Sequence, residues 1–199
     1  MINFYTVCIF LVIYLICSVN PAIIICKKKT GEDIRKLGSG NAGSANAMRV
    51  LGRLLGLVVV ILDIAKVFLS YYIAIFISKL FNHEIDVTFK TIFILASVIG
   101  HCFPVYYGFR GGKGVIVGIT VMAILEPQTA IICVISGLIV MLFTRTVAIG
   151  TLSGLVLYVI IALVTGHDYL TAVIISSLII MFKHRQSIQR ILTKQEHKF

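Results

Sequence analysis

The chain has 199 residues, of which 59% are apolar and only 13% are charged, and its mean hydropathy is +1.03. These values exclude an ordinary soluble domain, in which about a quarter of the residues are charged. The net charge of +10 lies mostly in short segments between apolar runs, which excludes a nucleic-acid-binding protein and favours anionic lipid or anionic substrates as partners.

The first apolar run covers residues 3–26 and ends in three lysines. We interpret it as a membrane span and not as a signal peptide, because it has no basic start and no small-residue cleavage site. The second run, residues 52–78, also exceeds the roughly 20 residues that a helix needs to cross a bilayer. Asp63 and Lys66 lie deep in it, three residues apart, and we expect a structural ion pair there in preference to a catalytic one.

The later apolar runs are too long for single helices. Thirty helical residues extend about 45 Å, so we expect Glu126-Pro127 to divide residues 115–144 and Gly166-His167-Asp168 to divide residues 148–183. We therefore predict one domain, residues 1–199, folded as an all-α integral membrane protein. It has about seven transmembrane helices, at 3–26, 52–78, 88–104, 113–125, 128–145, 148–165 and 168–183.

The basic residues set the orientation. Of the 18 Lys and Arg residues, this arrangement leaves only Lys79 and Lys90 in the loops or span ends of one side and Lys66 deep within a span. Loops rich in Lys and Arg face the cytoplasm, so we place the N-terminus outside and the C-terminus inside. Three glycine-, arginine- and histidine-rich segments then share the cytoplasmic side, where we expect them to form one site.

The first of these segments runs from Gly38 to Arg49. Its glycines permit the positive φ angles that let backbone amides converge on an anion: Gly38, Gly40 and Gly43. We expect Ser44 to cap a helix that carries Asn46, Arg49 and Arg53 on one face. A flexible connecting loop is the alternative. The match to the dinucleotide fingerprint is rejected, because no strand precedes it.

The second segment runs from Gly100 to Gly114. We reject a nucleotide-triphosphate loop there, because Tyr107 replaces its first glycine and Gly114 its Ser or Thr. A helix that starts after the glycines could instead attract phosphate with its N-terminus and Lys113. His101 fits either a substrate contact or a structural tether.

The third segment, His184 to Arg190, fits either a phosphate site or an anchor to anionic headgroups, and Arg145 has the same ambiguity. His101 and His184 are the candidates for a general base, since histidine titrates near neutral pH. The five cysteines lie in or beside apolar runs without metal-ligand spacing. We expect no metal site and no disulfide.

Together the three segments resemble the signatures of the bacterial acyl-phosphate:glycerol-3-phosphate acyltransferase family, the PlsY type. The family pattern Gly-Ser-Gly-Asn-x-Gly corresponds to residues 38–43, and Gly-His-x-Phe-Pro-Val followed by Gly-Gly-Lys-Gly is intact at 100–105 and 111–114. The likeness extends over nearly the whole chain. It implies transfer of a fatty acyl group from acyl phosphate to the 1-hydroxyl of glycerol 3-phosphate, in a bacterial plasma membrane, without a cofactor.

The resemblance also assigns the site residues. Four are expected to act on the substrate phosphates in catalysis: Ser39, Arg49, Lys113 and His184. The remaining substrate-binding residues are Gly40, Asn41, Gly43, Asn46, His101, Gly111, Gly112, Gly114, Arg145 and Ser187. The expected partners are glycerol 3-phosphate, acyl phosphate and membrane lipid, and the oligomeric state stays open.

The sequence departs from the family at a few positions. Ser44-Ala45 replaces Ala-Thr, Ser187 replaces an asparagine, and Ala148 replaces a common serine. These departures keep a catalytically silent phosphate- or lipid-binding relative as an alternative. A small anion transporter and an enzyme that uses an acyl thioester donor are further alternatives.

Overall fold

The computed structural model describes residues 3–196, which form ten α-helices and two short 3-10 helices. In chain order they are α1 (Phe4–Ser18), α2 (Pro21–Thr30), η1 (Ile34–Lys36), α3 (Ser44–Leu51), α4 (Arg53–Leu80), α5 (Val87–Cys102), η2 (Val105–Tyr107), α6 (Val115–Leu125), α7 (Pro127–Thr144), α8 (Val147–Thr165), α9 (Leu170–Lys183) and α10 (Arg185–Leu192).

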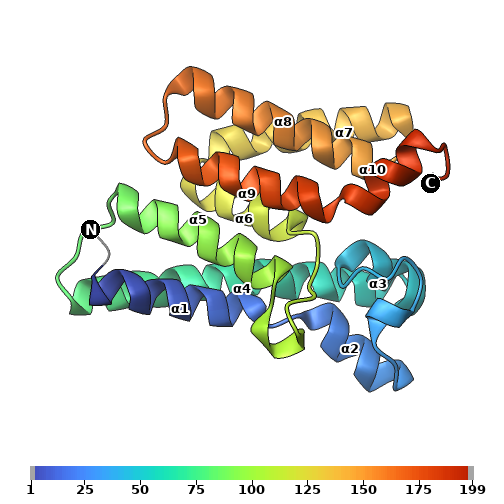
Figure 1. Cartoon of the computed structure of the whole chain (residues 1–199), viewed down its shortest axis with the longest axis horizontal. Helices are drawn as coiled ribbons and strands as arrows, with labels where there is room; N and C mark the ends of the chain where they lie inside the picture. The colour runs from blue at the N-terminus through green and yellow to red at the C-terminus, as the bar shows by residue number, and fades with distance from the viewer. Residues whose placement is uncertain (1–2, 197–199) are drawn as a thin grey trace.

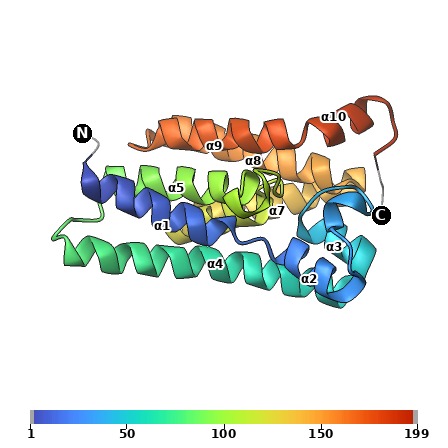
Figure 2. The same cartoon turned by 60° about the horizontal axis from the view of Figure 1, so that its bottom comes forward.

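The longer helices lie side by side in a bundle, and Figure 1 shows that α4 to α9 alternate in direction. The short helices α2, α3 and α10 gather at one end, which we call the motif end (Figures 1 and 2). The turns 81–86 and 166–169 lie at the opposite end, which we call the far end. The three sequence motifs thus meet at one end of the bundle.

The first predicted span is wrong in one respect, because residues 3–26 form two helices. Helix α1 ends at Ser18 and α2 starts at Pro21, with Asn20 as its N-cap accepting a hydrogen bond from Ile23 N. Proline suits the first turn of a helix and cannot continue an existing one. Asn20 Nδ2 also donates to Ala42 O (3.0 Å), so the break ties α2 to the first motif.

The two breaks predicted within the long apolar runs are present. Helix α6 ends at Leu125 before Glu126-Pro127, and α8 ends where Gly166 adopts a φ of 69°. Five helical segments are long and apolar enough to cross a membrane, with α1 and α2 counted together. The apolar helices α6 and α9 are shorter.

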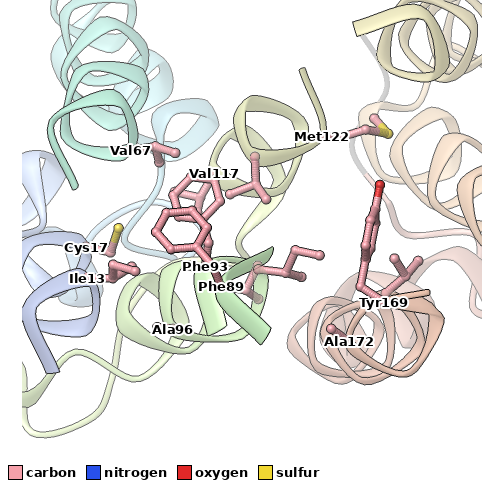
Figure 3. Packing of buried hydrophobic residues seen from close by; sticks show 14 of the residues in the cluster. Ile13, Cys17, Val67, Phe89, Phe93, Ala96, Val117, Met122, Tyr169 and Ala172 are labelled. Carbon is pink, nitrogen blue, oxygen red and sulfur yellow. The ribbon is translucent and has the colours of Figure 1, made fainter. Parts of the chain in front are cut away.

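The core fills the space between α1, α4, α5 and α6. Phe89 and Phe93 from α5 lie among Ile13, Val67 and Val117, and all five are fully buried (Figure 3). Large apolar side chains also cover the outside of the bundle; Phe143 is 86% exposed and Val164 81%. An outer surface of this kind suits lipid.

Helices α7 and α8 approach closely along three glycines. A Cβ on Gly137 would lie 2.8 Å from Gly150 O, and one on Gly154 would lie 2.9 Å from Cys133 O. Small residues four apart permit close contact of membrane helices. The hydropathy of α7 and α8 indicates that each can cross a membrane, and the glycine spacing indicates that they pack against each other.

Candidate functional site

Asn46 organises the first motif. Its side chain is 1% exposed; Oδ1 accepts from Ser39 N (2.8 Å), and Nδ2 donates to the carbonyl oxygens of residues 34, 37 and 41 (2.9–3.2 Å). Gly38 and Gly40 have the expected positive φ angles of 57° and 74°. The amide of Asn46 therefore fixes the backbone that presents Ser39.

Two local predictions about this segment are wrong. Gly43, with φ −142°, is the N-cap of α3, so Ser44 is its first helical residue and not its cap. Helix α3 ends before Gly52, whose φ is 90°, and Arg53 begins α4. Arg53 therefore does not extend the face that Asn46 and Arg49 share, because Gly52 interrupts the helix between them.

The second motif folds against the first. Gly111 N and Gly112 N donate to the carbonyl oxygens of Cys102 and His101 (both 3.2 Å). A Cβ on Gly112 would overlap His101 Nε2 and lie 2.9 Å from Ala42 O. Glycine is thus required where the two loops touch. Lys113 follows directly, just before α6 begins.

The third motif lies where α9 passes into α10. His184 is 2% exposed, and its Nδ1 lies 2.8 Å from Ile180 O. A carbonyl oxygen only accepts, so we assign the ring proton to Nδ1, which leaves Nε2 as an acceptor. Ser187 is fully buried, and its Oγ accepts from Lys113 Nζ (2.7 Å) and Arg190 Nη2 (3.2 Å).

A polar cavity of about 200 Å³ lies between the three motifs. It collects most of the predicted site residues: Ser39, Asn41, Gly43, Asn46, Arg49, His101, Lys113, Gly114, His184 and Ser187. The cavity is therefore lined from α3, α4, α5, α6, α8, α10 and the loops between them.

Four predicted residues do not line this cavity. Gly40 is exposed on the first loop, and Gly111 and Gly112 shape the second loop from behind. Arg145 is exposed at the turn between α7 and α8, with a φ of 53°. Its positive charge lies outside the polar cavity that the structure describes.

Other lining residues were not predicted as part of the site. Asp63 and Thr151 reach the cavity from α4 and α8, and Arg190 and Glu196 reach it from the C-terminal segment, where Arg190 Nε donates to Glu196 Oε2 (2.7 Å). The depth of Asp63 in an apolar run was a usable signal. Ala148 was marked only as a replacement of the family's serine, and Val147 gave no signal, since an apolar residue does not show which cavity it faces.

The charges in the cavity favour an anion. Burial, opposed by Glu196 and assisted by Arg190 and Arg49, lowers the pKa of Lys113 to about 8. Burial and the charge of Lys113 lower the pKa of His184 to about 4. At neutral pH the cavity thus holds a mostly protonated lysine beside a neutral histidine.

A second cavity, about 150 Å³ and almost entirely apolar, is enclosed by the five helices α5, α6, α7, α8 and α9. Val115 and Thr151 line both cavities. Its other walls include Met122, Gly137 and Tyr158. An anion-binding pocket that adjoins an apolar one suits an amphiphile with a phosphate and a hydrocarbon chain.

The fold and this pair of cavities define a multi-pass helical membrane protein whose cavities are suited to phosphorylated, lipid-like molecules. A sequence profile described as glycerol-3-phosphate acyltransferase matches residues 7–194. The chain belongs to the glycerol-3-phosphate acyltransferase family.

Individual relatives agree with this assignment. The glycerol-3-phosphate acyltransferase of Aquifex aeolicus strain VF5 is 36% identical, over 96% of this chain and 98% of its own. That of Halalkalibacterium halodurans is 37% identical, over 93% and 91%. The crystal structure of PlsY (YgiH), an integral membrane glycerol 3-phosphate acyltransferase, in its glycerol 3-phosphate form superposes with a TM-score of 0.87 at 33% identity, covering 98% of this chain and 95% of that one.

Proposed function

We propose that this protein transfers a fatty acyl group from acyl phosphate to the 1-hydroxyl of sn-glycerol 3-phosphate, which releases lysophosphatidic acid and phosphate. The observation that carries the proposal is that the two cavities are neighbours, with Val115 and Thr151 in the walls of both. The polar cavity suits the two phosphates, and the apolar cavity suits the acyl chain. Further support comes from PlsY structures in glycerol 3-phosphate and lysophosphatidic acid forms.

Each cationic or polar group in the cavity has a role in this reaction. Lys113 and Arg49 neutralise the phosphates, Ser39 contributes a hydrogen bond, and Nε2 of the neutral His184 accepts a hydrogen bond from a substrate hydroxyl. Ser187 and Arg190 hold Lys113 in place through the Ser187 hydroxyl. These groups act mainly by orientation and charge stabilisation, because acyl phosphate is already activated.

The reaction needs no strong protein base. The 1-hydroxyl oxygen attacks the acyl carbon, the bond from that carbon to the phosphate oxygen breaks, and the hydroxyl proton moves to the departing phosphate. A His184 pKa of about 4 makes this residue a poor proton acceptor near neutral pH. His184→Gln should therefore weaken glycerol 3-phosphate binding more than it lowers turnover, and loss of turnover with intact binding would contradict this role.

The identity of the acyl donor is the most specific part of the proposal. A compact phosphate fits a polar cavity of about 200 Å³ that is bounded by short loops. Coenzyme A would require additional contacts for its adenine and pantetheine. We therefore favour acyl phosphate over an acyl thioester.

We place the motif end on the cytoplasmic side of a bacterial plasma membrane. Lys27, Lys28 and Lys29 end α2 at this end, and Arg185 and Arg190 lie in α10. This bias follows the positive-inside rule. In this topology α1 with α2 and α4 to α9 give seven spans, of which α6 and α9 have only 11 and 14 residues. Such short helices require local thinning of the bilayer or partial depth.

The test uses purified protein in lipid vesicles with glycerol 3-phosphate and either palmitoyl phosphate or palmitoyl-coenzyme A. We expect lysophosphatidic acid from palmitoyl phosphate alone, and loss of product in Lys113→Ala. Product from palmitoyl-coenzyme A alone would replace the donor in the proposal. Absence of product from both, with glycerol 3-phosphate still bound, would establish the silent relative instead.

A further inference from the structure

Lys66 lies at the centre of a buried polar cluster beside the polar cavity. Its Nζ lies 2.7 Å from Asp63 Oδ1, 3.0 Å from His101 Nδ1 and 2.8 Å from Val19 O. Asp63, Lys66 and His101 are only 2%, 7% and 4% exposed. The expected ion pair is present, and it also reaches His101 of the second motif, far away in the sequence.

This arrangement determines which ring nitrogen of His101 carries the proton. A lysine ammonium has three donors and no acceptor; Lys66 Nζ is within hydrogen-bond distance of Val19 O and His101 Nδ1, and it forms an ion pair with Asp63. His101 Nδ1 must therefore accept from Lys66. Asp63 Oδ1 is 3.6 Å from the same nitrogen, too far to compete for a proton on it. Neutral His101 then carries its hydrogen on Nε2.

The Nε2 edge of the ring faces the second motif. Gly112 lies directly against it, since a Cβ at this position would overlap Nε2. Among residues 3–196, no group forms a hydrogen bond with His101 Nε2, and both His101 and Asp63 line the polar cavity. An N–H without a protein acceptor, on a residue that lines the polar cavity, is available to a substrate oxygen.

We propose that Lys66 and Asp63 are positioning residues that hold His101 as its Nε2–H tautomer, and that this N–H donates to an anionic oxygen of the substrates. His101 is then a donor and not a general base. His184 has the opposite tautomer, because its Nδ1 donates to Ile180 O. The assignment of an oxygen of glycerol 3-phosphate or the acyl donor as acceptor rests on the proposed function.

The first test compares two amides at residue 101. The amide nitrogen of His101→Gln can reach the position of Nε2, whereas that of His101→Asn reaches only the position of Nδ1. We expect His101→Gln to keep kcat/KM within about tenfold and His101→Asn to lose about a hundredfold, as removal of a hydrogen bond to a charged group predicts. A base would be lost equally in both variants, and that result would overturn the donor role.

The second test measures the tautomer directly. The protein, labelled with ¹⁵N-histidine in lipid nanodiscs, should show one histidine protonated only at Nε2, identified by its loss in His101→Gln. The double change Asp63→Leu, Lys66→Met removes both charges, so neither is left buried without a partner. We expect this variant to lose the single tautomer and about tenfold in kcat. Lys79→Met, at an exposed position on the same helix, should change neither.

The two readouts separate failure of this inference from failure of the proposed function. A wild-type His101 protonated at Nδ1, or a folded double variant with unchanged tautomer and unchanged kcat, would disprove the positioning role. A wild-type protein without acyltransferase activity would still report its tautomer. Titration with glycerol 3-phosphate or inorganic phosphate would then show whether the Nε2 resonance shifts; if neither anion shifts it, the donor role is wrong.

Discussion

Each end of the bundle contains a carboxylate beside a histidine; Asp63 is buried, and Glu126 is partly buried. At the motif end, Asp63 and His101 are joined through Lys66. At the far end, Glu126 Oε2 lies 2.8 Å from His167 Nε2, and Tyr169 Oη donates to Glu126 Oε1 (2.6 Å). The residue types are similar, but their surroundings differ.

The far-end cluster joins two turns, between α6 and α7 and between α8 and α9, and His167 stacks on Tyr169 with ring centroids 5.2 Å apart. Glu126 and His167 do not line the polar cavity, whereas Asp63 and His101 do. An acid beside a histidine thus serves structure where its partners are other turns. Such an acid serves the site where the neighbouring histidine lines a cavity, as His101 does beside Asp63.

The largest loss of activity, without a loss of stability, should come from Lys113→Met at the motif end. We expect kcat/KM to fall about a thousandfold, because the substrates lose a charged donor. Thermal stability should not fall. The folded-state pKa of Lys113 is about 8, below the ordinary 10.5, so the folded protein holds this charge at a cost at pH 7, which methionine removes.

Activity assays and thermal unfolding in detergent measure the two effects on the same sample. Lys79→Met, an exposed lysine at the end of α4, is the control and should alter neither quantity. Loss of stability and activity together in Lys113→Met would show that Lys113 supports the fold.

Gly112→Ala should have the next largest effect on the motif end. The added methyl would overlap His101 Nε2 and approach Ala42 O, so the two loops must separate and the donor must move. We expect kcat/KM to fall about a hundredfold, since a misplaced catalytic geometry of about 1 Å costs that much.

The matched control is Gly108→Ala in the same segment. No heavy atom lies within 4 Å of its ideal Cβ, and its φ is 63°, so this variant carries only backbone strain. Equal losses of activity in Gly108→Ala and Gly112→Ala would show that backbone strain, and not the contact with His101, limits the loop.

Helix breaks and contacts between distant residues differ in how far they could be predicted from the sequence. The helix breaks at Glu126-Pro127 and Gly166 were predictable because proline and glycine act locally. The break at Asn20-Pro21 was missed because apolar residues continue on both sides of it. The link from Lys66 to His101 depends on the packing of α4 against α5, and no sequence period encodes such a distant contact.

The pH dependence of kcat/KM should also distinguish the role of Lys113 from that of His184. Lys113 must be protonated to bind phosphate, so kcat/KM should fall as pH rises through about 8, by about tenfold for each further unit. An unperturbed lysine would maintain activity to about pH 10. His184, with a pKa of about 4, is neutral throughout this range.

A pH series of initial rates at low glycerol 3-phosphate concentration measures this profile. His184→Gln should lower kcat/KM without moving the break near pH 8. A break that moves with His184→Gln, or its absence below pH 10, would contradict the assignment of the break to Lys113.

The smallest effect on activity should come from the far end. Tyr169→Phe removes the hydrogen bond to Glu126 at a residue that is 7% exposed. We expect a loss of about 1.5–3 kcal/mol in stability, as for other hydrogen bonds to charged groups, measured by thermal unfolding in detergent. Because the bond joins two turns remote from the polar cavity, kcat/KM should change less than twofold. A drop in kcat/KM as large as that of His101→Asn, in a protein still folded at the assay temperature, would mean that the far-end turns set the spacing of α6 and α9 around the cavities. The two ends would then share one function.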